Sequence, residues 1–319
     1  MSRTRSLITG GAGFVGSHLV DRLMADGHEV LVLDSLQTGR RANIRRWIGH
    51  ERFTLIEHDV IDPWPRLFGF DRVYHLACAA SPAKHQKDPI HTMRTSVEGT
   101  LRALEVARAS GARFFLASTS EVYGDPTVHP QPESYRGTVH TTGPRACYDE
   151  GKRAAEALTS DFARMYGVDV RIARIFNTYG PRMDPFDGRV ITDFVRRALE
   201  GEPLRVFGDG TQTRSFCYVS DLVEGIERLM THDAPPLVTN LGNDREVTIG
   251  ELARRVHAIC GGVGLHFEDL PEDDPLRRRP DLSRAREFLD YEPQVPLNVG
   301  LAQVVARMRA ELGLNRAVA

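Results

Sequence analysis

Cysteine is scarce in this sequence, and long apolar runs are absent. The four cysteines, at positions 78, 147, 217 and 260 of 319, form no Cys-x-x-Cys pair and accompany no paired histidine spacing. This scatter argues against a disulfide framework or a zinc site, and it favours reduced thiols in a cytoplasmic protein with no bound metal. The apolar stretch 6–20 is interrupted by glycines and is too short to span a bilayer. We therefore expect neither a membrane segment nor a signal peptide.

The chain also has no large excess of positive or negative charge. The chain has 41 Lys and Arg against 43 Asp and Glu, a net charge of -2. This balance gives no reason to expect nucleic acid or a membrane surface as a partner. The arginine runs at 40–41, 45–46 and 277–279 are typical of solvated faces. With 41% hydrophobic and 26% charged residues, the composition is ordinary for a globular chain of one or two domains.

Short apolar segments alternate with helical periodicity over the first 180 residues. The expected strands cover residues 6–9, 29–34, 53–57, 72–77, 113–118 and 169–174. Helical spacing is found between them at 17–24, 92–110 and 148–166. Strands that alternate with helices in this way predict an α/β fold with a doubly wound parallel sheet of the Rossmann type.

After Gly180-Pro181 this rhythm breaks. Residues 181–319 are richer in proline and glycine, with short strands and helices near 188–201, 248–260 and 298–312. We interpret residues 1–180 as a dinucleotide-binding domain and residues 181–319 mainly as a smaller, mixed α/β substrate domain. Parts of 215–241 are expected to return to the first domain, so the two should pack around one cleft.

A glycine-rich turn follows the first strand and opens the first helix. Gly10, Gly13 and Gly16 permit a tight turn and let backbone N–H groups approach a pyrophosphate. The helix N-terminus favours the negative charge of that group. Because the turn lies between a strand and a helix, it predicts a dinucleotide site.

Asp34 ends the second expected strand. A carboxylate there accepts hydrogen bonds from the adenosine ribose 2′-OH and repels a 2′-phosphate, so NAD is favoured over NADP. Arg40 and Arg41 follow several residues too late to overturn this preference. Asp59 and Val60, just beyond the third strand, are well placed to bracket the adenine.

Tyr148 and Lys152 are four residues apart and share one helix face. An ammonium beside a phenol favours the phenolate, so we expect the pKa of Tyr148 to lie below its usual value of about 10. Such a tyrosine can take a proton from an alcohol as hydride leaves the same carbon. Thr119 and Glu121 follow the fifth strand, where parallel sheets bind ligands, and could orient the reacting hydroxyl and act as an acid or base. The simpler alternative is a capped loop with a solvated Glu121.

Three segments resemble the extended short-chain dehydrogenases/reductases that act on nucleotide sugars, the NAD-dependent epimerase/dehydratase family. They are Gly10-Gly11-Ala12-Gly13-Phe14-Val15-Gly16, Tyr148-Asp149-Glu150-Gly151-Lys152 and the segment 174–181. More narrowly, the chain resembles the UDP-glucuronate decarboxylases (UDP-xylose synthases) of this family. That narrower resemblance lies in residues 118–126, 143–152, 208–214, Asp273-Asp274-Pro275 and 278–281.

The resemblance implies oxidation of C4 of UDP-glucuronate by NAD, loss of CO2 from the resulting β-keto acid, and return of hydride to give UDP-xylose. It assigns catalytic roles to Tyr148, Lys152, Thr119, Glu121 and Arg278. Because arginine occupies positions 277–279, the last assignment is open by one position.

The resemblance also implies ligand-binding residues and a homodimer. Substrate contacts would be Asn177, Arg182, Arg214, His85 and Arg94. NAD contacts would be Gly10, Gly13, Phe14, Val15, Gly16, Asp34, Thr38, Gly39, Asp59, Val60, Leu76, Ala117, Tyr148, Lys152, Thr178 and Arg189. The dimer would form through the helices near 92–110 and 148–166, whose Leu101, Leu104, Leu158 and Phe162 fit an interface or, equally, a face turned toward their own sheet.

The segment 77–96 departs from the decarboxylase pattern. Cys78-Ala79 replaces the usual Ser-Pro, His85 replaces a tyrosine, and Arg94-Thr95-Ser96 replaces Lys-Thr-Asn. These positions are expected near the nicotinamide and the sugar. The exact substrate therefore stays open, whereas the redox residues are intact.

Three rival functions remain. A nucleotide-sugar 4,6-dehydratase would carry Asp-Glu where this chain has Ser120-Glu121, and the missing Asp removes the acid for the departing C6 hydroxyl. A 4-epimerase would need neither Glu121 nor Arg278. A non-catalytic NAD-binding protein is the least favoured, because Thr119, Tyr148 and Lys152 are all present.

Overall fold

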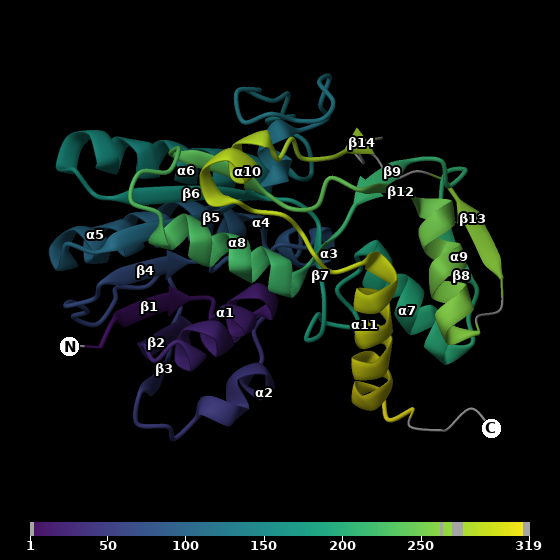
Figure 1. The fold of residues 1–319 in the computed structure, drawn as a ribbon, viewed down its shortest axis with the longest axis horizontal. Coiled ribbons are helices and arrows are strands. Elements are labelled where there is room, and N and C mark those ends of the chain that lie inside the picture. Colours follow the sequence, from purple (N-terminus) through teal and green to yellow (C-terminus); the bar gives the residue numbers. More distant parts are fainter. Residues whose placement is uncertain (1–2, 262–263, 270–276, 315–319) are drawn as a thin grey trace.

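A seven-stranded parallel sheet forms the centre of the larger part of the molecule (Figure 1). The structure is a computed structural model that describes residues 3–261, 264–269 and 277–314, so the Asp273-Asp274-Pro275 segment lies outside the described residues. The strand order is β11-β6-β5-β4-β1-β2-β3. The strands are β1 (Arg5–Thr9), β2 (Glu29–Asp34), β3 (Phe53–Glu57), β4 (Arg72–His75), β5 (Arg113–Thr119), β6 (Val170–Ile175) and β11 (Val238–Leu241). The predicted Rossmann-type sheet is confirmed, and its order reverses direction between β1 and β4.

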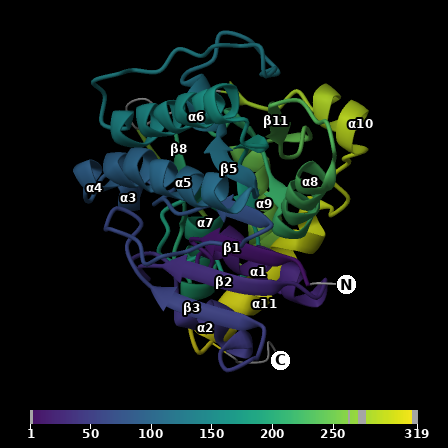
Figure 2. The ribbon, with the colours of Figure 1, turned by 90° about the vertical axis from the view of Figure 1, so that its left-hand side faces the viewer.

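Helices cover both faces of this sheet (Figure 2). One face carries α1 (Phe14–Ala25), α2 (Arg41–Ile44), α8 (Val219–Thr231) and α10 (Ser283–Leu289). The other carries α4 (Pro89–Arg94), α5 (Thr100–Ser110) and α6 (Ala146–Tyr166). The helix predicted at 92–110 is divided, because a π-helical turn at Thr95–Gly99 separates α4 from α5. Small residues allow α6 to approach this turn, since a Cβ on Gly151 would lie 3.0 Å from Cβ of Ser96.

The strands are apolar on both faces, as a doubly covered sheet requires. Neighbouring residues such as Leu7 and Ile8 are both fully buried, and they belong to different hydrophobic clusters on opposite faces. Leu104 and Phe162 pack into the cluster beneath α5 and α6. They therefore face their own sheet and are not available for a dimer interface, whereas Leu101 remains 37% exposed.

The smaller part of the molecule lies beside the carboxyl ends of the strands and appears on the right of Figure 1. Helices α7 (Val190–Glu200), α9 (Ile249–Cys260) and α11 (Leu297–Glu311) pack on one another there, close to their predicted positions. Three short sheets complete it: β8 (Leu204–Phe207) with β13 (Leu265–Glu268), β12 (Glu246–Thr248) with β9 (Thr213–Ser215) and β14 (Arg277–Arg278), and β7 (Thr178–Tyr179) with β10 (Cys217–Tyr218).

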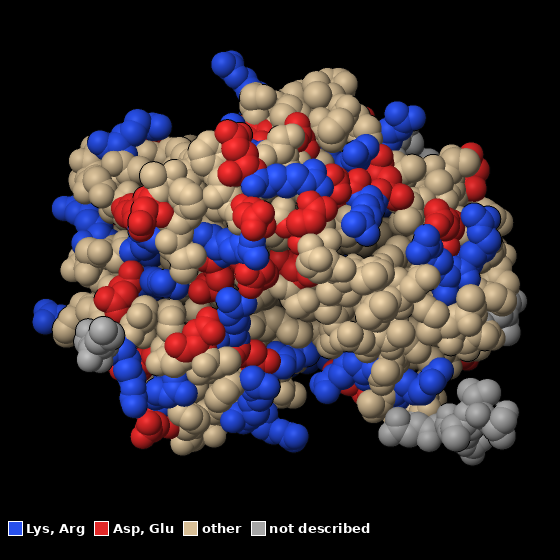
Figure 3. Space-filling view, viewed as in Figure 1, with Lys and Arg blue, Asp and Glu red and all other residues tan. Residues whose placement is uncertain are grey.

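The chain crosses between the two parts several times. After β10, helix α8 packs on α1, and β11 then pairs with β6 in parallel, Thr239 opposite Ala173. Basic and acidic side chains are interspersed over the face shown in Figure 3. Within the described ranges, no helix combines the length and the apolar character needed to cross a membrane.

Candidate active site

A cavity of about 490 Å³ lies where the carboxyl ends of the strands meet the smaller part. Its wall begins at the glycine turn after β1 and continues through Thr119, Glu121 and Tyr148. Arg214 and Arg278 line the wall contributed by the smaller part. In open parallel sheets, ligands bind where the strand order reverses, which is the β1–β4 position beneath this cavity.

The glycine turn is sterically obligatory. Gly10 has φ +74°, and a Cβ there would lie 2.8 Å from the backbone nitrogen of Ala77. A Cβ on Gly16 would lie 2.1 Å from the carbonyl oxygen of Gly10. Gly13 precedes α1 without a side-chain cap, and residues 13–16 line the cavity, so the N-terminus of this helix borders the cavity with no capping side chain. This is the local geometry that binds a diphosphate.

Asp34 is held rigidly at the end of β2. Its two carboxylate oxygens accept hydrogen bonds from the backbone N–H groups of Ala12 and Leu36, each at 2.8 Å. Burial raises the pKa of Asp34, and these two hydrogen bonds oppose that rise. A Cβ on Gly39 would lie 2.8 Å from Oδ1 of Asp34, so glycine leaves room for the carboxylate and whatever it binds.

The neighbouring arginines do not neutralise Asp34. Arg40 forms an ion pair with Asp184 at 2.5 Å, and Arg41 pairs with Glu57. The carboxylate of Asp34 therefore keeps its negative charge for a ribose, as NAD recognition requires.

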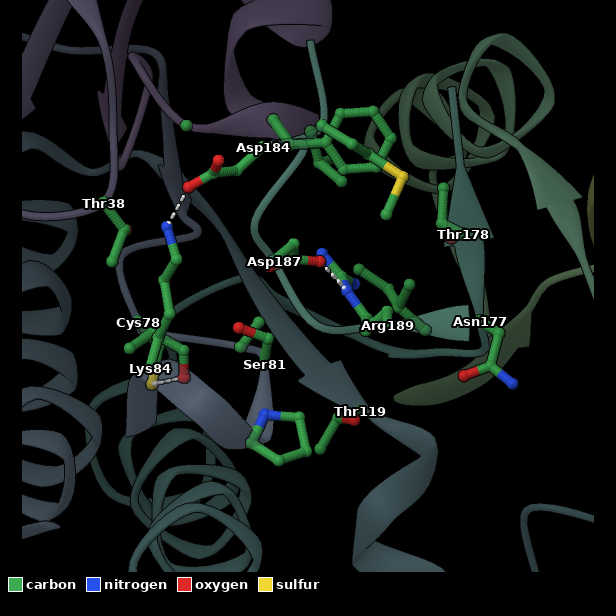
Figure 4. Close-up of a pocket in the computed structure, with 18 of the residues that line it drawn as sticks. Thr38, Cys78, Ser81, Lys84, Thr119, Asn177, Thr178, Asp184, Asp187 and Arg189 are labelled. Atoms are coloured by element: carbon green, nitrogen blue, oxygen red, sulfur yellow. Dashed lines mark hydrogen bonds and ion pairs between the residues drawn. The ribbon is translucent and has the colours of Figure 1, made fainter. Parts of the chain in front are cut away.

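The other residues predicted to contact NAD mostly border the same cavity. Asp59 lines it and also accepts a hydrogen bond from Nε2 of His91 at 2.8 Å. Arg189 lines it and pairs with Asp187 (Figure 4). Further lining residues from the prediction are Phe14, Val15, Thr38, Val60, Leu76, Ala117 and Thr178. Together with the glycine turn and Asp34, this lining fits NAD.

Helix α6 brings Tyr148 and Lys152 to the floor of the cavity. The hydroxyl of Thr119 hydrogen bonds to the phenol, and Nζ of Lys152 donates to the carbonyl oxygen of Ala117 at 3.0 Å. Tyr148 is 6% exposed, and burial raises its pKa above the usual range. The prediction that Lys152 brings this pKa below its usual value is therefore wrong for the protein without its cofactor, because the burial of the phenol dominates.

Glu121 is held between two guanidinium groups. Its Oε2 accepts from Arg145 at 2.5 Å, and its Oε1 accepts from Arg278. Burial alone would raise the pKa of Glu121, but the two cations lower it below its usual value. Of the arginines at 277–279, Arg278 is the one that is buried and reaches this carboxylate.

Arg145 was not singled out by the sequence analysis. It precedes Tyr148 by three residues, at the N-terminal boundary of α6. The i, i+3 spacing between Arg145 and Tyr148 is the feature of the sequence that could have predicted that the two side chains lie close together.

The residues predicted for the UDP-sugar fall into two groups. Arg214 and Asn177 line the cavity, and Arg214 is the register partner of Arg278 across β9 and β14. Arg182 borders the cavity too, but its guanidinium is engaged by Asp21 at 2.5 Å.

Two residues predicted for the sugar site do not line the cavity. Arg94 is exposed, pairs with Glu98 one turn later on the same helical segment, and does not line the cavity. His85 is buried beneath the ring of Tyr148 and does not border the cavity directly.

A dinucleotide turn and a Tyr–Lys helix thus face one cavity, which is the arrangement of a short-chain dehydrogenase/reductase. Residues 6–242 match the description "NAD dependent epimerase/dehydratase family". The chain belongs to this family.

Relatives with assigned activities are similar over almost the whole chain. UDP-glucuronic acid decarboxylase 1 of Xenopus tropicalis is 53% identical over 311 residues, covering 97% of this chain and 73% of that protein. UDP-glucuronic acid decarboxylase 5 of Arabidopsis thaliana is 51% identical over 317 residues, covering 99% and 92%. The solved UDP-glucuronic acid 4-epimerase of Bacillus cereus, in complex with UDP-glucuronic acid and NAD, has a TM-score of 0.85 at 26% identity, covering 97% of this chain and 100% of that chain.

Proposed function

We propose that this protein is a UDP-glucuronate decarboxylase that forms UDP-xylose with NAD as a catalytic cofactor. The observation that carries the proposal is the 53% identity to a UDP-glucuronic acid decarboxylase over 97% of the chain. The site supports it chemically, because two arginines converge beside Tyr148 where a carboxylate-bearing sugar would lie. The departures at Cys78, His85 and Arg94 leave the catalytic groups unchanged.

The first step is oxidation at C4. Tyr148 takes the proton of the C4 hydroxyl, and Thr119 orients that hydroxyl through its own contact with the phenol. Bound NAD would supply the hydride acceptor, the hydride for the later return, and a positive ring charge that favours the phenolate. Lys152 would hold the cofactor ribose while keeping its bond to Ala117.

The second step follows from the ketone at C4. This ketone is β to the C6 carboxylate, so the C5–C6 bond breaks with its electron pair flowing into an enolate, and CO2 leaves. A proton then adds to C5 and hydride returns to C4. The net change is UDP-glucuronate plus one proton giving UDP-xylose plus CO2. Arg278 would position the carboxylate, and Glu121 would act near C5; Arg214 and Asn177 would hold the UDP.

The rival activities fit this site less well. A 4,6-dehydratase needs an acid for the C6 hydroxyl, and the position before Glu121 is Ser120, a buried hydroxyl. A UDP-glucuronate 4-epimerase must keep the carboxylate on the sugar, and the UDP-glucuronic acid 4-epimerase of Bacillus cereus is 26% identical, against 53% for the Xenopus decarboxylase.

One assay tests the proposal. The purified protein, with NAD, is incubated with UDP-glucuronate while CO2 and the nucleotide-sugar product are measured. We expect CO2 and a UDP-pentose in equal amounts. The proposal is overturned if UDP-glucuronate is only epimerised or left intact while UDP-glucose or dTDP-glucose is converted.

We further propose that the enzyme is a cytoplasmic homodimer. The four cysteines are free thiols, which supports a reducing compartment. Leu101 on α5 and Met165 on α6 are 37% and 71% exposed, which supports association through these helices. Sedimentation at micromolar concentration should give twice the chain mass, and a monomer would contradict the dimer.

A further inference from the structure

Asp149 is a buried carboxyl group that the mechanism above leaves unused. It follows Tyr148 on α6 and is 7% exposed. Its Oδ1 is buried and lacks a hydrogen-bond partner among the described residues. Its Oδ2 lies 4.0 Å from Nε of Arg145. A buried carboxyl with an unsatisfied oxygen is costly as an anion, so its position calls for an explanation.

Arg145 connects Asp149 to Glu121. One nitrogen of its guanidinium group, Nη2, donates to Glu121 at 2.5 Å, while Nε faces Asp149 at 4.0 Å. The contact with Glu121 is a charge-assisted hydrogen bond, whereas the separation from Asp149 is too long for a hydrogen bond. The guanidinium of Arg145 therefore hydrogen bonds to Glu121, while Asp149 lies near it as a second carboxylate that it does not hydrogen bond.

The charge of Asp149 decides the charge of this cluster. The charged groups that face it are Glu121 from the turn after β5, Arg145 before α6, Arg278 from β14 and Glu150 on its own helix. Burial, with Glu121, raises the pKa of Asp149 to about 7, against the opposing effect of the two arginines. With Asp149 neutral, Glu121 and the two arginines carry a net charge of +1. With Asp149 ionised, the four groups sum to zero.

A net positive cluster suits this reaction at two points. It attracts the C6 carboxylate of the sugar, and it keeps Glu121 ionised and fixed in direction. An ionised Asp149 would compete for Arg145, since closing the 4.0 Å gap to a hydrogen bond would draw the guanidinium away from Glu121. The positive charge offered to the sugar carboxylate would fall at the same time.

We propose that Arg145 is a positioning residue that fixes Glu121 for decarboxylation, and that Asp149 controls this hold through its own charge. Neutral Asp149 leaves Arg145 on Glu121, and the site binds and decarboxylates the sugar acid. When Asp149 is ionised, it competes with Glu121 for Arg145, and the hydrogen bond from Arg145 to Glu121 is weakened. The inference rests on the proposed function and adds two residues and a pH dependence to it.

The first test measures binding, not turnover. In a Tyr148→Phe background, the affinities for UDP-glucuronate and for UDP-xylose, which lacks the carboxylate, are compared between pH 6 and pH 8.5 by calorimetry. We expect the preference for UDP-glucuronate to fall roughly tenfold across this range, with a midpoint near the pKa of Asp149. A preference that does not change with pH overturns the proposal, and this measurement needs no change at Asp149.

The second test removes the titrating group. Asp149→Asn, added to the same background, should make the preference independent of pH. Glu150→Gln is the matched control, because it removes the next carboxylate on the helix, one that pairs with Arg153 at 3.5 Å. It should keep a pH-dependent preference, with the midpoint moved to slightly lower pH, because Glu150 is one of the charges that raise the pKa of Asp149. An Asp149→Asn protein that retains that dependence contradicts the assignment to Asp149.

The third test uses turnover, after the wild-type protein has been shown to release CO2 from UDP-glucuronate. Arg145→Gln should lower kcat roughly a hundredfold with bound NAD unchanged, and Arg145→Lys should restore part of it. Adding Asp149→Asn to Arg145→Gln should have no further effect on the pH profile, because Asp149 acts through Arg145. Additive effects would overturn the coupling. An inactive wild-type protein would instead refute the proposed function.

Discussion

The imidazole of His85 lies parallel to the phenol of Tyr148, with ring centroids 5.1 Å apart and an angle of 8° between the planes. His85 is 1% exposed, and Sγ of Cys147 lies 3.7 Å from its Nδ1. Burial and the charge of Arg145 lower the pKa of His85 to about 4, so the ring is neutral at physiological pH. His85 therefore packs against the ring of the predicted base and does not line the cavity.

Removing this ring should impair both stability and catalysis. His85→Ala leaves a void beside Tyr148, and we expect a loss of about 2 kcal/mol in unfolding free energy and a roughly tenfold fall in kcat. His85→Phe preserves an aromatic stack and should retain most activity. Thermal unfolding and steady-state kinetics check both, with His257→Ala on an exposed face of α9 as the control. Full activity in His85→Ala would remove the supporting role.

The same histidine should make stability depend on pH. Its folded pKa of about 4 lies below the ordinary value, so the unfolded chain binds the proton first as pH falls. Stability linked to His85 is complete above about pH 6.5 and is lost as pH falls toward 4.

His85→Phe provides the comparison, because phenylalanine does not titrate. Between pH 6.5 and 4, the wild-type protein should lose about 2 kcal/mol more unfolding free energy than this variant. Urea unfolding at several pH values measures the difference. Parallel pH curves for the two proteins would show that His85 protonates equally in both states.

Much of the cofactor half of the site was predictable because its determinants are local. The turn at Gly10–Gly16 needs glycine whatever packs around it, and Asp34 follows from its place at the end of a strand. Tyr148 and Lys152 share a helix face by spacing alone. The ion pair of Arg94 with Glu98 could also be predicted from the sequence, because residues at i and i+4 lie side by side on a helix. Such a pair competes with any contact between Arg94 and the substrate.

Other features depend on residues distant in sequence. Arg182 donates a hydrogen bond to Asp21, which lies 161 positions away, and no local sequence pattern predicts that partner. The stack of His85 on Tyr148 arises only when α3 (Pro82–His85) packs against α6. The raised pKa of Tyr148 comes from burial, which the Tyr-x-x-x-Lys spacing does not encode.

Cofactor selectivity should follow the carboxylate of Asp34. Asp34→Ser removes the acceptor for the ribose and the repulsion toward a 2′-phosphate, so NAD should bind about tenfold more weakly and NADP more tightly than before. Titration with both cofactors measures the ratio. Glu29→Gln, at the opposite end of β2, is the matched control and should leave both affinities unchanged. An unaltered NAD to NADP ratio in Asp34→Ser would contradict the assignment.

The phenol of Tyr148 should matter for chemistry and not for cofactor retention. Tyr148→Phe keeps the ring on His85 but removes the proton acceptor, so kcat should fall by roughly three orders of magnitude. Bound NAD, measured after denaturation of the purified protein, should match the wild type. Undiminished turnover would show that another group is the base.

Asp184 joins two cations from distant segments beside the cofactor half of the cavity. Lys84 from α3 meets one carboxylate oxygen, and Arg40 from the loop after β2 meets the other at 2.5 Å (Figure 4 shows the Lys84 contact). All three residues line the cavity. Although burial opposes it, the hydrogen bond from Lys84 helps to lower the pKa of Asp184, so the pair is ionised at neutral pH.

This network should slow the release of NAD, because the segments it ties together border the cavity on either side. Asp184→Asn should raise the NAD dissociation rate about tenfold, and added salt should raise it in the wild-type protein but less in the variant, since these partly exposed pairs are screened. Competition with excess unlabelled NAD measures the rate. Glu202→Gln, which removes an exposed partner of Arg197, is the control and should leave release unchanged. If Asp184→Asn releases NAD at the wild-type rate at low salt, the three side chains serve only to stabilise the loops.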